Sequence, residues 1–91
     1  MQPVSSVTAF LARHLSRSPV DAEVEAVLAL LDPIERRVVE ELARTPRREH
    51  RLRRLAEQSG TTWEPARYDR VESRALRRLG RELTRRGWLQ P

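Results

Sequence analysis

The chain has 91 residues, no cysteine and a formal net charge of +5, and all 18 of its basic residues are arginine. This composition excludes disulfide frameworks and thiolate metal sites, and the length predicts a small domain with a thin core. Because no apolar run approaches the roughly 20 residues of a membrane span, we expect no membrane partner and a cytoplasmic location.

The first two helices are predicted from apolar spacing and from a start signal. Residues 1–17 are expected to form an N-terminal helix, which begins at one of the two serines before Val7 and ends near residue 17. Ser18 as an N-cap and Pro19 at the first helical position predict the start of a second helix. Its apolar residues recur at helical spacing, so we expect it to cover residues 19–31.

A third helix has the clearest start signal in the chain. Asp32 is a good N-cap, Pro33 suits the first helical position, and Glu35 has the spacing of a capping box. The helix is expected to end near Arg44, where a loop begins. No segment shows convincing strand alternation, which favours an all-α protein.

A fourth helix is predicted over about residues 49–58. Leu52, Leu55 and Ala56 form its inward face, and Gly60 lies at its C-terminal end. An alanine and a glycine four residues apart, followed by an arginine-rich helix, are typical of a helix-turn-helix unit. The sequence therefore predicts an all-α fold: a small helical domain of four to five helices that contains a helix-turn-helix.

The last helix is expected to begin after residue 60 and to reach at least Leu79. Thr61 and Glu64 have capping-box spacing, Gly80 is a candidate break or bend, and Gly87 is expected to cap the end. On this helix an apolar stripe is expected to dock on the core, with Leu79 facing Leu55. A second stripe beside it is made of arginines, namely Arg67, Arg70, Arg74, Arg77, Arg81 and Arg85.

The charge is unevenly distributed along the chain. Residues 1–43 carry four arginines against seven acidic residues, whereas residues 44–91 carry fourteen arginines against six. The cationic second half predicts a polyanionic partner, since guanidinium groups suit phosphates and guanine edges. Catalytic triads, phosphate-binding glycine loops and metal-ligand clusters are absent from the sequence, so we expect neither an enzyme nor a metal or cofactor.

Several motifs between residues 22 and 80 also occur together in one known family. They are Leu31-Asp32-Pro33-Ile34-Glu35-Arg36-Arg37-Val38-Val39, Arg48-Glu49-His50, Leu52, Leu55-Ala56, Gly60 and Val71-Glu72-Ser73-Arg74-Ala75-Leu76-Arg77-Arg78-Leu79. These residues resemble region four of the primary sigma factors of bacterial RNA polymerase. The resemblance implies a four-helix module of residues 18–91 that binds promoter DNA in the major groove and docks on the flap of the polymerase β subunit.

The resemblance also implies which residues contact double-stranded DNA. Arg67, Arg70 and Arg74 would enter or line the major groove. Asp69 stands where the family has an arginine, and it would repel phosphate unless it accepts from a cytosine amine or pairs with Arg70. The remaining contacts, on phosphates, would be Arg54, Arg77 and Arg78, together with Thr61 and Thr62 unless these only cap the helix.

Two alternatives remain beside a DNA-binding transcription regulator. The first is an adaptor that binds RNA polymerase or a sigma partner without reading DNA. Its surface would be the apolar groove between the middle helices together with Trp88 and Leu89, although these two residues are also well suited to fold back onto the core. The second is a truncated winged helix, because residues 83–89 look like the lead-in to a wing.

Overall fold

The computed structural model describes residues 3–15 and 17–89, and these residues contain helices and no strand. The expected all-α class is therefore confirmed. The helices are α1 (Pro3–His14), α2 (Asp21–Leu28), α3 (Pro33–Arg44), α4 (Arg48–Ser59) and α5 (Pro65–Arg85).

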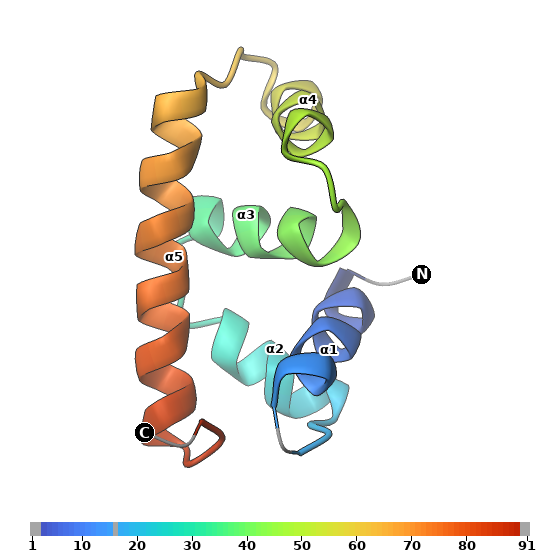
Figure 1. The fold of residues 1–91 in the computed structure, drawn as a ribbon, viewed down its shortest axis with the longest axis vertical. Helices are drawn as coiled ribbons and strands as arrows, with labels where there is room; N and C mark the ends of the chain where they lie inside the picture. The colour runs from blue at the N-terminus through green and yellow to red at the C-terminus, as the bar shows by residue number, and fades with distance from the viewer. Residues whose placement is uncertain (1–2, 16, 90–91) are drawn as a thin grey trace.

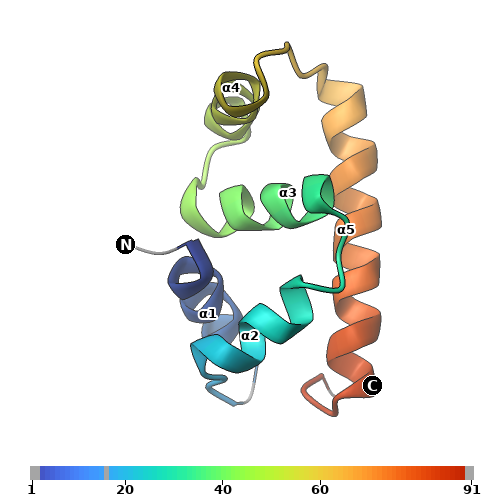
Figure 2. The ribbon, with the colours of Figure 1, turned by 180° about the vertical axis from the view of Figure 1, so that it is seen from behind.

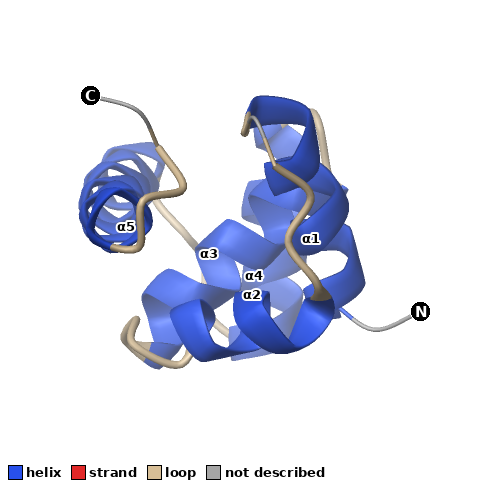
Figure 3. Cartoon of the chain, turned by 90° about the horizontal axis from the view of Figure 1, so that it is seen from below, coloured by secondary structure: helices blue, strands red, loops and turns tan. Residues whose placement is uncertain are grey.

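The long helix α5 forms one side of the molecule, and the other helices lie against one flank of it (Figures 1 and 2). Helix α3 crosses α5 near its middle. Helix α4 lies on one side of α3, and α1 and α2 lie on the other side (Figure 1). Viewed along α5, the four shorter helices group together and leave the opposite side of α5 uncovered (Figure 3).

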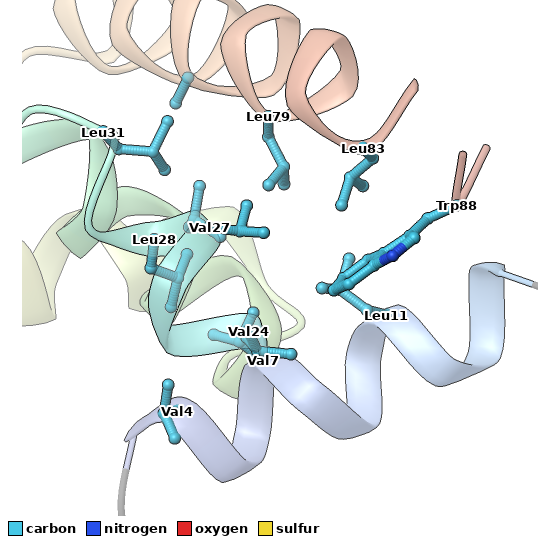
Figure 4. Close-up of a cluster of buried hydrophobic side chains, with 12 residues drawn as sticks. Val4, Val7, Leu11, Val24, Val27, Leu28, Leu31, Leu79, Leu83 and Trp88 are labelled. Carbon is cyan, nitrogen blue, oxygen red and sulfur yellow. The ribbon is translucent and has the colours of Figure 1, made fainter. Parts of the chain in front are cut away.

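Helix α3 separates two hydrophobic clusters. Its neighbouring residues Val38 and Val39 point into different clusters, as residues about 100° apart on a helix can. The larger cluster joins α1, α2 and the C-terminal half of α5, and it includes Trp88 (Figure 4). The smaller cluster joins α3 and α4 to the N-terminal part of α5. It consists of Val38, Leu55, Trp63, Tyr68 and Val71.

The two clusters overturn one expected contact. Leu55 and Leu79 are both buried, but Leu55 belongs to the smaller cluster and Leu79 to the larger one. The expectation that they face each other is wrong because α3 lies between α4 and the C-terminal half of α5. A helix-turn-helix pairing of α4 with α5 is likewise not confirmed, since the backbone of each helix packs mainly against α3.

Helix α3 begins and ends as the sequence predicts, whereas α2 does not begin where predicted. Asp32 is the N-cap of α3, and its N–H donates to Glu35 Oε1 over 3.1 Å. The N-cap of α2 is Val20 rather than Ser18. The reason is that Glu23, three residues after Val20, accepts the free Val20 N–H over 3.1 Å.

The start of α5 also differs from the prediction. Its N-cap is Glu64, directly before Pro65, and not Thr61. Proline fits only the first turn, so it fixes the start of the helix more strongly than the capping-box spacing of Thr61 does. The helix then continues through Gly80 without a break to Arg85.

Two glycines close their helices as expected. Gly60 follows α4 with a φ of 73°, and Gly87 follows α5 with a φ of 78°. Beyond α5, the Gly87 N–H donates to the Thr84 carbonyl over 3.0 Å, and the Trp88 N–H donates to the Leu83 carbonyl over 2.8 Å. This is the bonding pattern of a Schellman motif, and it turns Trp88 back onto the larger cluster.

Alanine substitutions at Gly60 and Gly80 are expected to change stability in opposite directions. A Cβ at either position meets no atom within 4 Å, so only the backbone conformation matters. At Gly60 the positive φ makes alanine unfavourable by about 1 kcal/mol, whereas in the interior of α5 Gly80→Ala should stabilise by about 0.5–1 kcal/mol. Urea unfolding followed by circular dichroism measures both. An unchanged stability of Gly60→Ala would contradict the left-handed cap.

Candidate nucleic-acid interface

Two buried carboxylates on α3 hold the neighbouring helices in place. The side chain of Glu35 is 0% exposed and that of Glu41 is 2% exposed. Glu35 Oε2 accepts from Arg74 Nε over 2.9 Å, and its Oε1 accepts from Arg78 Nη1 over 3.1 Å. A buried carboxylate is tolerated only when its oxygens are paired, so Arg74 and Arg78 of α5 stabilise the fold by pairing with Glu35.

Glu41 binds α4 in the same manner. Its Oε1 accepts from Arg54 Nε over 2.6 Å, and its Oε2 accepts from Gln58 Nε2 over 2.9 Å. Burial alone acts to raise the pKa of Glu41, but the hydrogen bonds from Arg54 and Gln58 outweigh it and lower the pKa below its ordinary value. The carboxylate form is therefore the one that the folded protein stabilises.

Three predicted DNA contacts, Arg54, Arg74 and Arg78, thus have acidic partners within the protein. Sequence reasoning missed these pairs because the partners are 13, 39 and 43 residues apart. The sequence nevertheless indicates that these two glutamates are buried. Glu35 and Glu41 each lie three residues from Val38, on the side of the helix that the apolar pattern predicts to be buried.

Three more of the predicted contacts, Thr61, Thr62 and Arg67, lie in the turn before α5 and in the first turn of that helix. Arg67 lies over the ring of Trp63, with 4.1 Å between its Cζ and the ring centroid. Trp63 is itself buried in the smaller cluster, so this stacking ties Arg67 to the surface of the protein. Thr61 and Thr62 are exposed in the turn. Neither residue caps α5.

Asp69 pairs with Arg48 and not with Arg70. Its Oδ2 lies 2.6 Å from Arg48 Nη2, which also donates to the Pro65 carbonyl. The pairing with Arg70, one of the two alternatives that the sequence left open, is therefore not formed, because α4 brings its first arginine against this side of α5. One consequence is that Arg70 has no acidic partner among the described residues.

The exposed side of α5 carries a row of unpaired arginines. Arg70, Arg77 and Arg81 are exposed, and within the described part of the chain none of them makes an ion pair. Their spacings of seven and four residues place them on one side of the helix, along about 16 Å of its length. We call these three residues the outer arginine row.

Another arginine makes its hydrogen bonds within the protein. Arg51 is buried, its Nε donates to the Tyr68 hydroxyl over 2.7 Å, and its Nη1 donates to the Thr45 and Pro46 carbonyls. Burial raises the pKa of Tyr68 to about 12, so its hydroxyl stays protonated at neutral pH. Arg51 therefore fixes the loop before α4 and is not available to a ligand.

The surface expected for an adaptor is present only in part. A groove of about 260 Å³ lies between α3 and α4, and its apolar lining includes Ile34, Leu55 and Trp63. Trp88 is 5% exposed and lies in the larger cluster, with Arg17 stacked over its ring. It is therefore a core residue and not an exposed hook. The described residues 83–89 end α5 and form its cap, without a strand of a wing.

No group of three or more histidine, aspartate and glutamate side chains within residues 3–15 and 17–89 is arranged to hold a metal ion. Among the helices described, none combines the length and the apolar character needed to cross a bilayer.

Replacing Glu35 by glutamine is expected to destabilise the protein by about 2–3 kcal/mol. The amide cannot neutralise Arg74 and Arg78, but both arginines reach solvent, which keeps the cost at the lower end for a broken buried pair. Urea unfolding measures the change. Glu57→Gln is the matched control, since Glu57 is exposed and loses the same charge. Equal stability of the two variants would show that the Glu35 pairs contribute nothing.

The contribution of Glu41 should depend on pH in a defined direction. Because folding lowers its pKa, its stabilising effect is fully present above the ordinary value of 4.5 and is lost as the pH falls through the lowered value. The free energy of unfolding of the natural chain should therefore exceed that of Glu41→Gln at neutral pH. This difference in unfolding free energy should become smaller below about pH 4. A difference that grows in acid would contradict the lowered pKa of Glu41.

No protein family, curated protein or solved structure matches this chain. The resemblance to region four of sigma factors therefore remains an interpretation of the quoted motifs, without support from a relative.

Proposed function

We propose that the protein binds double-stranded DNA through the outer arginine row of α5 and acts in the cytoplasm as a regulator of transcription. The observation that carries the proposal is the contrast between paired and unpaired arginines on one helix. Arg74 and Arg78 are held by Glu35, whereas Arg70, Arg77 and Arg81 have no acidic partner in the described structure.

The shape of the molecule supports this choice of partner. Helix α5 has 21 residues, and the side away from the other helices is uncovered (Figure 3). The major groove of DNA is about 12 Å wide and accepts a helix whose long side is exposed in this way. Three like charges along one side of a helix repel each other, and a phosphate backbone relieves that repulsion.

The described geometry favours phosphate contacts over extensive base reading. Arg67 is stacked on Trp63, and Asp69 is neutralised by Arg48, so Arg70 is the remaining candidate for a base contact near the start of α5. Arg77 and Arg81 lie one and two turns beyond residue 74 and suit phosphates. The role in transcription rests on the resemblance of residues 22–80 to sigma region four.

The groove between α3 and α4 favours a second candidate function. Its apolar lining by Ile34, Leu55 and Trp63 would suit a segment of RNA polymerase, such as the flap of the β subunit, or of a sigma partner. In that case the protein would be an adaptor that regulates initiation by protein contact. Binding of DNA by the outer arginine row is not needed for this function.

DNA affinity should depend steeply on salt. With about two or three phosphate contacts, depending on whether Arg70 contacts a base, the log–log slope of affinity against salt is expected to be about −2 to −3. Arg77→Ala should flatten the slope by about one unit and weaken binding to all sequences alike. Fluorescence anisotropy with a random-sequence duplex measures both. Arg53→Ala is the matched control, because Arg53 is also exposed and unpaired in the described structure but lies on α4.

Binding to duplex DNA and capture of RNA polymerase distinguish the two candidate functions. Arg70→Ala should change the preference among duplexes if Arg70 contacts a base, by about 1–3 kcal/mol at one base pair. If the protein binds no duplex at low salt but captures core RNA polymerase, DNA binding is excluded and the adaptor function takes its place. Equal losses in Arg53→Ala and Arg77→Ala would show that net charge, and not the outer arginine row, carries DNA affinity.

A further inference from the structure

A second groove lies between α2 and α5, beside the outer arginine row. It has a volume of about 510 Å³ and is open to solvent at the level of the last turns of α5. It is lined by Val27 of α2, by Leu30 and Leu31 of the turn after α2, and by Arg78, Arg81, Glu82 and Arg85 of α5. We call it the α2–α5 groove.

The floor of this groove is apolar and partly exposed. Val27 and Leu31 are buried beneath it in the larger cluster, as Figure 4 shows for the side chains between α2 and α5. Leu30 is 50% exposed, which makes it one of few large aliphatic side chains that the described structure leaves open to solvent. An exposed leucine at a concave apolar site offers surface that a partner could bury.

The wall of the groove carries more positive charge than the fold neutralises. Glu82 pairs with both Arg85 and Arg86, so one carboxylate serves two arginines. Arg81 has no acidic partner in the described part of the chain. An apolar floor with an uncompensated cationic wall is complementary to a ligand that is apolar on one side and anionic on the neighbouring side.

We propose that the α2–α5 groove binds an acidic amphipathic helix of another protein. An apolar side chain of that helix would cover Leu30, and carboxylates one turn away would pair with Arg81 and Arg85. A groove between two helices is a common place for a third helix to bind by its apolar side. Duplex DNA fits this groove poorly, because its outer surface is mainly charged backbone and offers little apolar surface to cover Leu30.

The test uses a synthetic amphipathic peptide of about 15 residues, with leucines at helical spacing and glutamates beside them. A second peptide has lysine in place of each glutamate. Isothermal titration calorimetry with the full chain should show binding of the glutamate peptide only. Backbone amide chemical shifts should change at residues 27–31 and 78–85, and not at the groove between α3 and α4.

Two variants and one matched control locate the site. Leu30→Asp should weaken the glutamate peptide about ten-fold or more, and Arg81→Glu should do the same while improving the lysine peptide. Val20→Asp should leave the affinity unchanged, since Val20 is 59% exposed, lies outside the groove and receives the same substitution. Circular dichroism checks that each variant is folded.

Several results would overturn the proposal. These are no binding of the glutamate peptide, equal binding of both peptides, or unchanged affinity in Leu30→Asp. Self-association of the chain that Leu30→Asp abolishes would identify a second copy as the occupant and would exclude the proposed partner. None of these results depends on DNA binding, so the two proposals are tested separately.

Discussion

The pairing of Glu35 with Arg74 and Arg78 is the interaction on which the arrangement of helices depends. It joins the start of α3 to the middle of α5, at the crossing from which the two hydrophobic clusters extend to either side (Figure 1). Burying the Glu35 carboxylate is costly, and the cost is offset by the Asp32 N–H and by two arginines at matching positions along α5. The crossing point is thereby specified more sharply than two small hydrophobic clusters alone would specify it.

Glu41 positions α4 in the same way that Glu35 positions α5, through a buried carboxylate with paired oxygens. Because its partners Arg54 and Gln58 lie one turn apart on α4, they fix how that helix is rotated about its own axis. Rotation then determines which α4 side chains enter the smaller cluster, including Leu55. A chain of this length has few aromatic residues to shape its core, so charged groups supply part of the specificity.

Local signals predicted much of the fold, and long-range contacts account for what they missed. The start of α3 and the glycine caps depend on neighbouring residues, and these predictions are confirmed. Ser18 and Thr61 were wrong as caps because a nearby glutamate or proline set the start of the helix instead. The arginine stripe is present, but periodicity cannot tell an arginine with a distant carboxylate from one that has none.

Different constraints over evolutionary time act on the outer arginine row and on the paired arginines Arg74 and Arg78 of the same helix. Loss of Glu35 leaves Arg74 without its acidic partner and leaves Arg78 with Asp32 alone, and loss of either arginine leaves the buried carboxylate half satisfied. Changes at residues 35, 74 and 78 are therefore constrained together. Arg70, Arg77 and Arg81 have no such tie within the described structure. Divergent copies of this sequence would therefore keep residues 35, 74 and 78 together. The outer arginine row would be kept only where the partner that the molecule binds requires it.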